Sequence, residues 1–247
     1  MPGKVFLSMV MCVMVYSSCY GESALDRVSS SYLFGDYSNA VCEGLAAAED
    51  ENNPEVLYRL GLSYLKLGNY AKARNNFRTI IKKFRESQFY QPALVKLADA
   101  YFFEKDLQKA KSLYQELLSK DIASTFQPLI YLRLGQIAGK EGQWNEEKKY
   151  VEIIQKEYPQ SIENTYAQIL EKRGYFFTIQ VGAFSQRKNA LNLLNELKAK
   201  YPAYLVRENF DDIILYKVRI GKFKEKGYVE KIKRSLIKDG YASRIYP

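Results

Sequence analysis

Apolar residues in the first two thirds of the chain follow the spacing of packed helices, in blocks separated by short turns. The turns recur after 33, 37 and 37 residues, at Gly35-Asp36-Tyr37, Gly68-Asn69-Tyr70, Lys105-Asp106-Leu107 and Gly142-Gln143-Trp144. Small residues precede each later turn, and small and large ones follow it: Gly61 with Ala73 and Phe77, Ala98 with Ala110 and Tyr114, Gly135 with Glu147 and Val151. We therefore predict stacked pairs of antiparallel helices, because one pair cannot bury its own apolar face.

Residues 175–247 follow a different pattern, in which short alternating stretches flank two helical ones. Phe177, Ile179 and Val181 alternate with Thr178 and Gln180, the period of a strand with one buried face. The predicted elements are a strand ended by Gly182, a helix from the N-cap Ser185 to about Lys200, strands at 204–206 and 213–220, a helix at 228–238 ended by Gly240, and a strand at 241–246. This βαββαβ order predicts a ferredoxin-like α+β module with helices on one face of its sheet and the other face open.

The chain begins like an export signal, with Lys4 before an apolar run from Val5 to Val15. That run is shorter than the roughly 20 apolar residues of a membrane-spanning helix, so we expect its removal. Two routes stay open: cleavage after Gly21, or acylation of Cys19, whose preceding residues resemble a bacterial lipoprotein signal except for Tyr16 in place of leucine. Membrane contact is expected only if Cys19 is acylated.

Four segments follow from these patterns. Residues 1–21 form the signal, 22–159 the helical repeats, 160–174 a capping helix and linker ending at Gly174, and 175–247 the α+β module.

Positive charge is concentrated in the α+β module. Residues 175–247 hold 15 Lys+Arg against 7 Asp+Glu, a net of +8 out of +9 for the whole chain. Such a surface suits an anionic partner or is simply solvated. The chain has no histidine, no phosphate-binding loop, no nucleophile elbow and no metal-ligand cluster in its sequence, so we expect neither enzymatic activity nor a cofactor.

The repeat frame resembles the tetratricopeptide repeat family. The resemblance covers three units over residues 54–159, with Pro159 where that family often has proline, and a degenerate first unit at 22–50. Pro54, Pro92, Pro128 and Trp144 are interpreted as structural. The family implies a concave face that holds a peptide or a partner helix, here an unidentified envelope protein.

The α+β module resembles the SPOR (sporulation-related repeat) domain in two motifs. They are Phe177-Thr178-Ile179-Gln180-Val181-Gly182-Ala183-Phe184 and Tyr216-Lys217-Val218-Arg219-Ile220-Gly221. Members of that family bind peptidoglycan glycan strands that amidases have stripped of stem peptides, which accumulate at the division septum. The resemblance implies a targeting module rather than a catalyst.

Carried over by position, Gln180 matches the family's glutamine on the first strand, and Lys217 stands where arginine is common. Thr178 and Arg219 are expected to flank the same open face. Two positions depart from the family, since Ala183 replaces a frequent serine and Leu215 stands where an aromatic residue often supports a sugar ring. Tyr216, Phe210 or Tyr204 would then supply the aromatic surface.

Two rival interpretations remain. RNA-recognition modules share the βαββαβ order, but their third strand needs an aromatic core of which this chain has only Tyr216, so we expect no nucleic acid. Alternatively, the repeats are an adaptor for envelope or outer-membrane assembly, and the C-terminal module only positions it. The favoured prediction is an exported cell-envelope protein of the periplasm that binds glycan strands and recruits a protein partner, and that is an outer-membrane lipoprotein if Cys19 is acylated.

Overall fold

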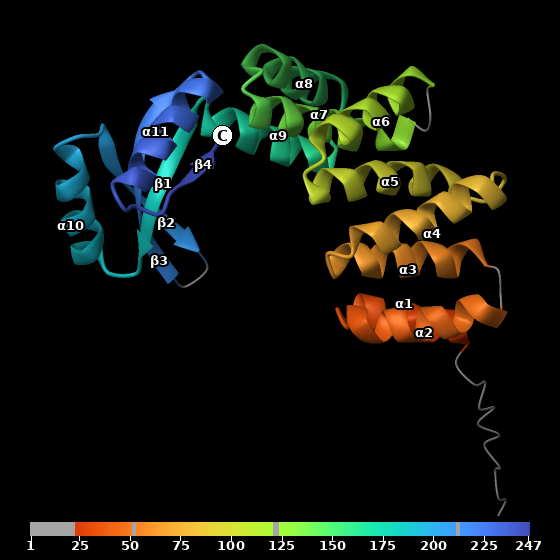
Figure 1. Ribbon diagram of the computed structural model, residues 1–247. Helices are drawn as coiled ribbons and strands as arrows, with labels where there is room; N and C mark the ends of the chain where they lie inside the picture. The colour runs from red at the N-terminus through yellow and green to blue at the C-terminus, as the bar shows by residue number, and fades with distance from the viewer. Residues whose placement is uncertain (1–22, 51–52, 121–123, 211–212) are drawn as a thin grey trace, which may run out of the picture.

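The computed structural model describes residues 23–50, 53–120, 124–210 and 213–247. The expected export signal, with Cys19 and its two processing routes, lies outside the described residues. Helices stack in pairs from α1 and α2 at one end to α8 and α9 at the other (Figure 1). They are α1 (Ala24–Leu33), α2 (Tyr37–Asp50), α3 (Pro54–Lys66), α4 (Tyr70–Lys83), α5 (Tyr90–Glu104), α6 (Leu107–Ser119), the 3-10 turn η1 (Ser124–Phe126), α7 (Gln127–Glu141), α8 (Trp144–Glu157) and α9 (Ile162–Arg173).

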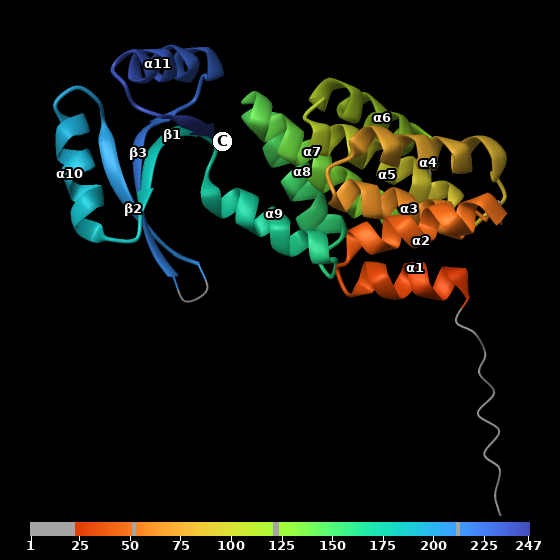
Figure 2. The same cartoon turned by 60° about the horizontal axis from the view of Figure 1, so that its bottom comes forward.

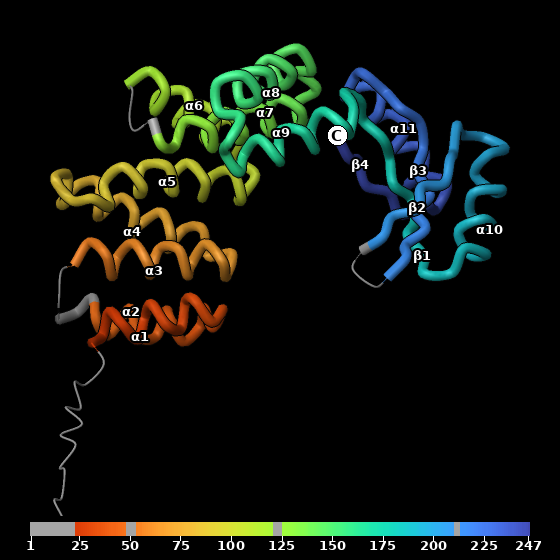
Figure 3. The backbone as a smooth tube through the Cα atoms, turned by 180° about the vertical axis from the view of Figure 1, so that it is seen from behind, coloured from red at the N-terminus to blue at the C-terminus, as the bar shows by residue number. Residues whose placement is uncertain are grey.

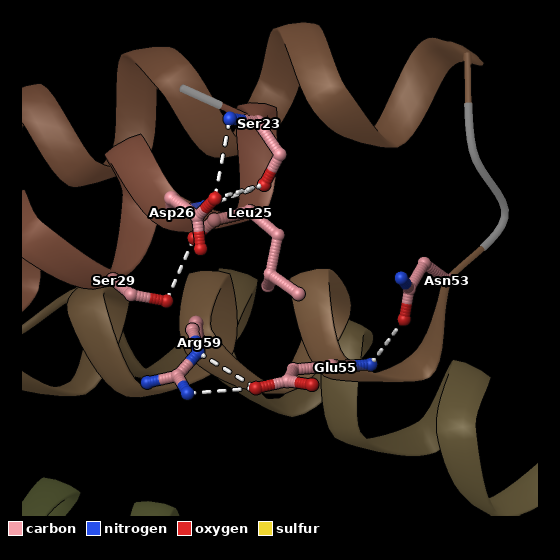
Figure 4. Close-up of polar contacts among 7 residues, drawn as sticks. All are labelled: Ser23, Leu25, Asp26, Ser29, Asn53, Glu55 and Arg59. Atoms are coloured by element: carbon pink, nitrogen blue, oxygen red, sulfur yellow. Dashed lines mark hydrogen bonds and ion pairs between the residues drawn. The ribbon is translucent and has the colours of Figure 1, made fainter. Parts of the chain in front are cut away.

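Side-chain caps fix where the first helices begin (Figure 4). The Ser23 hydroxyl accepts from the Asp26 amide at 3.1 Å, and the Asp26 carboxylate accepts from the Ser23 amide at 3.2 Å. This reciprocal capping box satisfies two amides that have no partner within the helix. At α3, the Asn53 side chain accepts from the Glu55 amide at 2.8 Å. Local sequence therefore sets the start of both helices.

The predicted small-to-large packing between helices is confirmed. Phe77 of α4 is fully buried against α3, and a Cβ added to Gly61 would lie 2.6 Å from its ring. The turns also repeat, because Gly35, Gly68 and Gly142 have φ of 81°, 74° and 78°. Lys105 takes the same left-handed conformation with φ 73°, so the turn geometry persists where glycine is replaced. The described residues from Ala24 to Arg173 form an all-α solenoid.

The C-terminal module has the predicted βαββαβ order. Its elements are β1 (Phe177–Phe184), α10 (Arg187–Lys198), β2 (Ala203–Phe210), β3 (Ile213–Phe223), α11 (Lys226–Lys238) and β4 (Arg244–Tyr246). The strands form an antiparallel sheet in the order β2-β3-β1-β4. The core between sheet and helices includes Phe177, Ile179, Val218, Ile220, Leu194, Leu197, Val229 and Leu236. Helices α10 and α11 thus cover one face of the sheet (Figure 2).

Several predicted boundaries in this module were wrong. Strand β1 does not end at Gly182, because the pairing with β3 shifts register between Gln180 and Gly182 and then continues to Phe184. A bulge of this kind lets a strand pass through a glycine that otherwise reads as a stop. Helix α10 begins at Arg187, and its N-cap is Gln186 rather than Ser185. The Gln186 side chain forms no capping hydrogen bond. The last strand is shorter than expected and begins at Arg244.

The two parts of the chain are in direct contact. The Trp144 ring at the start of α8 lies 4.8 Å, centroid to centroid, from the Phe177 ring of β1. Its indole Nε1 donates to the carbonyl oxygen of Lys224 at 2.8 Å. Trp144 is therefore structural, as expected, but it joins the solenoid to the sheet module rather than one repeat to the next. Viewed from behind, β4 runs beside the end of α9 (Figure 3). No helix in the described ranges is long and apolar enough to cross a membrane.

Candidate functional site

The face of the sheet opposite α10 and α11, called the open face below, carries all six predicted site residues. Strand register places Gln180 between Arg219 of β3 and Arg244 of β4. One pair further along β3, Lys217 lies opposite Ala183 on one side and Val206 on the other. The remaining members are Thr178, opposite Tyr246, and Leu215, opposite Glu208. Residues that lie far apart in the sequence, such as Thr178 and Arg219, thus share one surface.

Gln180 and Arg219 each leave a hydrogen-bonding atom unused. The side-chain carbonyl oxygen of Gln180 and the Nε of Arg219 are both enclosed, and neither has a hydrogen-bond partner among the described residues. An enclosed polar atom without a partner costs about 1–3 kcal/mol. The two residues are register partners on adjacent strands. One acceptor and one donor on adjacent strands of the open face are therefore left without a partner among the described residues.

Thr178 has a more structural part than expected. Only 3% of its surface is exposed, and its hydroxyl lies 3.2 Å from the Ile220 carbonyl oxygen and 3.0 Å from the Tyr204 hydroxyl. It holds β1 to β3 and fixes the Tyr204 side chain on the open face. Ala183 is exposed and Leu215 is half-buried. Neither side chain adds a polar contact, because both are hydrocarbons.

The expected aromatic substitutes are distributed unequally. Tyr204 lies on the open face, whereas Tyr216 packs against the helix-covered core and cannot support a ligand there. The side chain of Phe210 lies outside the described residues. Tyr246 of β4, which sequence reasoning missed, lies beneath the guanidinium groups of Arg219 and Arg244, at 5.9 and 5.1 Å from its ring centroid.

Glu208 was also missed, and it changes the electrostatics of the open face. Its carboxylate pairs with Arg219 at 2.7 Å and with the ammonium of Lys217. The hydrogen bond from Lys217, followed by the charge of Arg219, lowers the pKa of Glu208 in spite of partial burial. Lys217 is thus an internal ion-pair partner rather than a free donor. The alternation of β2 puts Tyr204, Val206 and Glu208 on one face, but no sequence pattern gives their register against β3.

A pocket of about 390 Å³ opens at the end of this face that adjoins the solenoid. From the sheet it is lined by Thr178, Tyr204, Val206, Glu208, Arg219 and Tyr246. Aromatic rings, a hydroxyl and charged groups therefore surround a space large enough for a small ring with polar substituents.

A second pocket, of about 490 Å³, lies in the solenoid. Its lining comes mainly from the first helix of each pair: Tyr32 of α1, Tyr58 and Lys66 of α3, Lys96, Asp99 and Phe103 of α5, and Arg133 of α7. Burial raises the pKa of Tyr58 to about 12, which disfavours ionisation of this phenol further. The surface combines aromatic rings with three cationic side chains.

Asp99 lines this second pocket, called the solenoid groove below, and binds two of its cationic side chains. Asp99 is only 1% exposed. It accepts from Tyr114 at 2.6 Å, from Lys96 at 2.8 Å and from Arg133 at 3.2 Å. Burial opposes its ionisation, but Lys96 and Arg133 with these hydrogen bonds outweigh burial and lower the pKa of Asp99. The groove therefore holds two cations against one fixed carboxylate, with Lys66 in addition.

Comparison with known families agrees with this architecture. The model of the SPOR domain matches residues 174–245, and that of the tetratricopeptide repeat matches residues 55–87 and 92–121. The chain therefore carries tetratricopeptide repeats followed by a C-terminal SPOR domain. Domains of the first family mediate protein–protein interactions, and domains of the second bind peptidoglycan in the cell envelope.

Solved structures with similar helical arrangements are only distantly related. The MamA protein is 21% identical over 74% of this chain and 96% of its own, with a TM-score of 0.47. Pseudomonas aeruginosa pilF is 20% identical over 62% and 68%, at 0.45. A tetratricopeptide repeat protein from Parabacteroides merdae is 14% identical over 72% and 64%, at 0.49. At these identities and TM-scores, the functions of these proteins are not assigned to this chain. A search of curated proteins finds none with significant similarity.

Proposed function

We propose that this protein binds peptidoglycan glycan strands stripped of their stem peptides through the open face of its SPOR domain. The observation that carries the proposal is the pair formed by Gln180 and Arg219, whose unused acceptor and donor lie on adjacent strands of that face. An amide and a guanidinium together match the hydroxyl and acetamido groups of amino sugars. Tyr204 and Tyr246 add apolar rings on which a sugar can rest.

The departures at Ala183 and Leu215 are compatible with this function because other residues supply what they lack. Tyr246 takes the part of the missing ring, and Arg244 adds a second guanidinium beside Gln180. The site then binds sugar rings within a glycan strand rather than a group at the end of the strand. The protein is exported to the envelope and acts in division or wall remodelling.

The solenoid groove recruits a protein partner. Its tyrosines and phenylalanine suit apolar side chains, and Lys66, Lys96 and Arg133 suit carboxylates, so the partner segment is acidic and contains aromatic or aliphatic anchors. Weak glycan binding at many sites along a polymer is reinforced when the second module is also engaged. In the alternative, the solenoid is an envelope-assembly adaptor and the SPOR domain only positions it.

Co-sedimentation with amidase-treated sacculi tests the site with a matched pair of glutamines. Gln180→Ala removes the amide on the open face, whereas Gln186→Ala removes an exposed amide that caps no helix amide. We expect Gln180→Ala to bind roughly tenfold more weakly than the wild type, since hydrogen bonds to a buried ligand group contribute about 1–1.5 kcal/mol each. Gln186→Ala should bind as tightly as the wild type. Equal binding of the two variants would contradict the assignment of Gln180.

A further inference from the structure

Arg173, the last residue of α9, belongs to the solenoid but lines the pocket on the open face of the sheet. It lies just before the segment that matches the SPOR domain, residues 174–245. Around the same pocket stand Arg219 and Lys222 of β3 and Phe176 of the linker. Figures 1 and 2 show why these segments meet, since the C-terminal strand β4 ends beside α9. The pocket is thus bounded by both modules.

The position of Arg173 is held by a buried partner in the preceding helix. Its Nη2 donates to the Glu147 carboxylate at 2.6 Å, and Glu147 is fully buried in α8. Glycine at position 139 makes room for this carboxylate, because a Cβ there would lie 2.7 Å from it. The Nε of Arg173 remains enclosed and without a hydrogen-bond partner. A buried ion pair of this geometry fixes the guanidinium in place and leaves donor capacity unused.

The charges around the pocket favour an anion. Three cations, Arg173, Arg219 and Lys222, line the pocket, where Glu147 pairs with Arg173 and Glu208 is shared between Arg219 and Lys217. Lys222 forms no ion pair with any described residue, and its ammonium lies 5.0 Å from the centroid of the Phe176 ring. A ligand with an apolar ring face and a carboxylate fits this combination.

Removing a stem peptide creates such a group. An amidase adds water across the amide between the muramyl lactyl carbonyl and the first amino acid, which leaves a carboxylate on the sugar and an amine on the departing peptide. We propose that Arg173, with Lys222, binds this free lactyl carboxylate, so that the SPOR domain and the last solenoid helix form one composite site that distinguishes stripped from intact strands. The proposal rests on the proposed function and adds to it the group that is recognised.

The test uses the full chain and soluble glycan strands released from amidase-treated sacculi. Half of the strands keep their carboxylates, and half have them converted to neutral methylamides. We expect the wild type to bind the free-carboxylate strands roughly tenfold more tightly, as a charge-assisted hydrogen bond contributes about 1.5 kcal/mol or more. Arg173→Gln should lose most of this preference and keep wild-type affinity for the methylamide strands.

Two companion variants separate recognition from folding. Glu147→Gln keeps the cation but removes the carboxylate that positions it, and it should weaken the preference less than Arg173→Gln does. The double variant with Glu147→Gln and Arg173→Gln contains no unpaired buried charge, and it should lose the preference while folding normally by circular dichroism. An unchanged ratio in the double variant overturns the composite site but leaves glycan binding intact. Failure of the wild type to bind either strand would overturn the proposed function itself.

Discussion

Trp144 and Phe177 pack with their ring centroids 4.8 Å apart and so join the last helix pair of the solenoid to the first strand of the SPOR domain. The indole N–H of Trp144 also donates to Lys224 just before α11. Gly142 lies against the same phenylalanine, because a Cβ there would come within 2.8 Å of its ring. The two modules are therefore docked through a specific apolar contact rather than joined only by a linker.

Replacing Trp144 with alanine is expected to release this docking. The substitution removes an aromatic pair and a hydrogen bond to a carbonyl, together about 2 kcal/mol of contact free energy. We expect a larger radius of gyration by small-angle X-ray scattering and faster proteolysis near residues 174–176. Tyr166→Ala, at a half-exposed aromatic position on α9, is the control and should change neither measurement.

Helix packing in the solenoid is tested by Gly61→Ala, with Gly227→Ala on α11 of the SPOR domain as the control. Gly61→Ala should lower the free energy of unfolding by about 1–3 kcal/mol, because the new methyl group meets the ring of Phe77. Gly227→Ala meets nothing within 4 Å, and should leave stability unchanged or raise it by up to about 1 kcal/mol through helix propensity. Urea denaturation distinguishes these results, and a stable Gly61→Ala variant would contradict the packing described.

Much of this fold was accessible from the sequence, because its signals are periodic and local. The helix pairs, the βαββαβ order and the open-face positions of Gln180, Lys217 and Arg219 follow from spacing or motif. The register shift at Gly182 does not, because it depends on pairing with β3. Glu208 escaped for the same reason, since strand register decides which cations it meets.

The ion pair between Glu147 and Arg173 could not be predicted from the repeat pattern for a different reason. Glu147 occupies the repeat position at which Ala73 and Ala110 are buried in the preceding repeats. A glutamate at that position matches the repeat pattern poorly. Its partner Arg173 comes from the next helix, at the end of the array. Local periodicity describes repeats that contact similar neighbours, whereas the last repeat contacts a different kind of module.

Asp99 predicts a specific loss of stability in acid. Its pKa is lowered in the folded protein, so it stabilises the fold above the unfolded value of roughly 3.9 and loses this contribution as pH falls through the folded value. Asp99→Asn should be less stable at pH 7 and should depend less on pH below about 4. Urea denaturation at several pH values gives the comparison, and parallel curves for wild type and variant would contradict the assignment.

Glu208 is expected to weaken the binding of anionic ligands to the open face, because it neutralises two of its cations. Glu208→Gln releases Lys217 and Arg219 from their shared carboxylate, so binding to strands with free carboxylates should tighten and become more dependent on salt. Glu230→Gln makes the same change in net charge on α11, over the other face, and is the control. Binding isotherms at low and high salt would show equal effects of the two variants if only net charge mattered.

The central claim is that the protein recognises glycan strands stripped of their peptides. Its most direct test is co-sedimentation of the wild-type chain with sacculi before and after amidase treatment, at matched amounts of glycan. Binding should rise with the extent of stripping and reach its maximum on fully treated walls. Equal binding to treated and untreated sacculi, or binding to neither, would contradict the claim and favour the solenoid as an adaptor that the SPOR domain only positions.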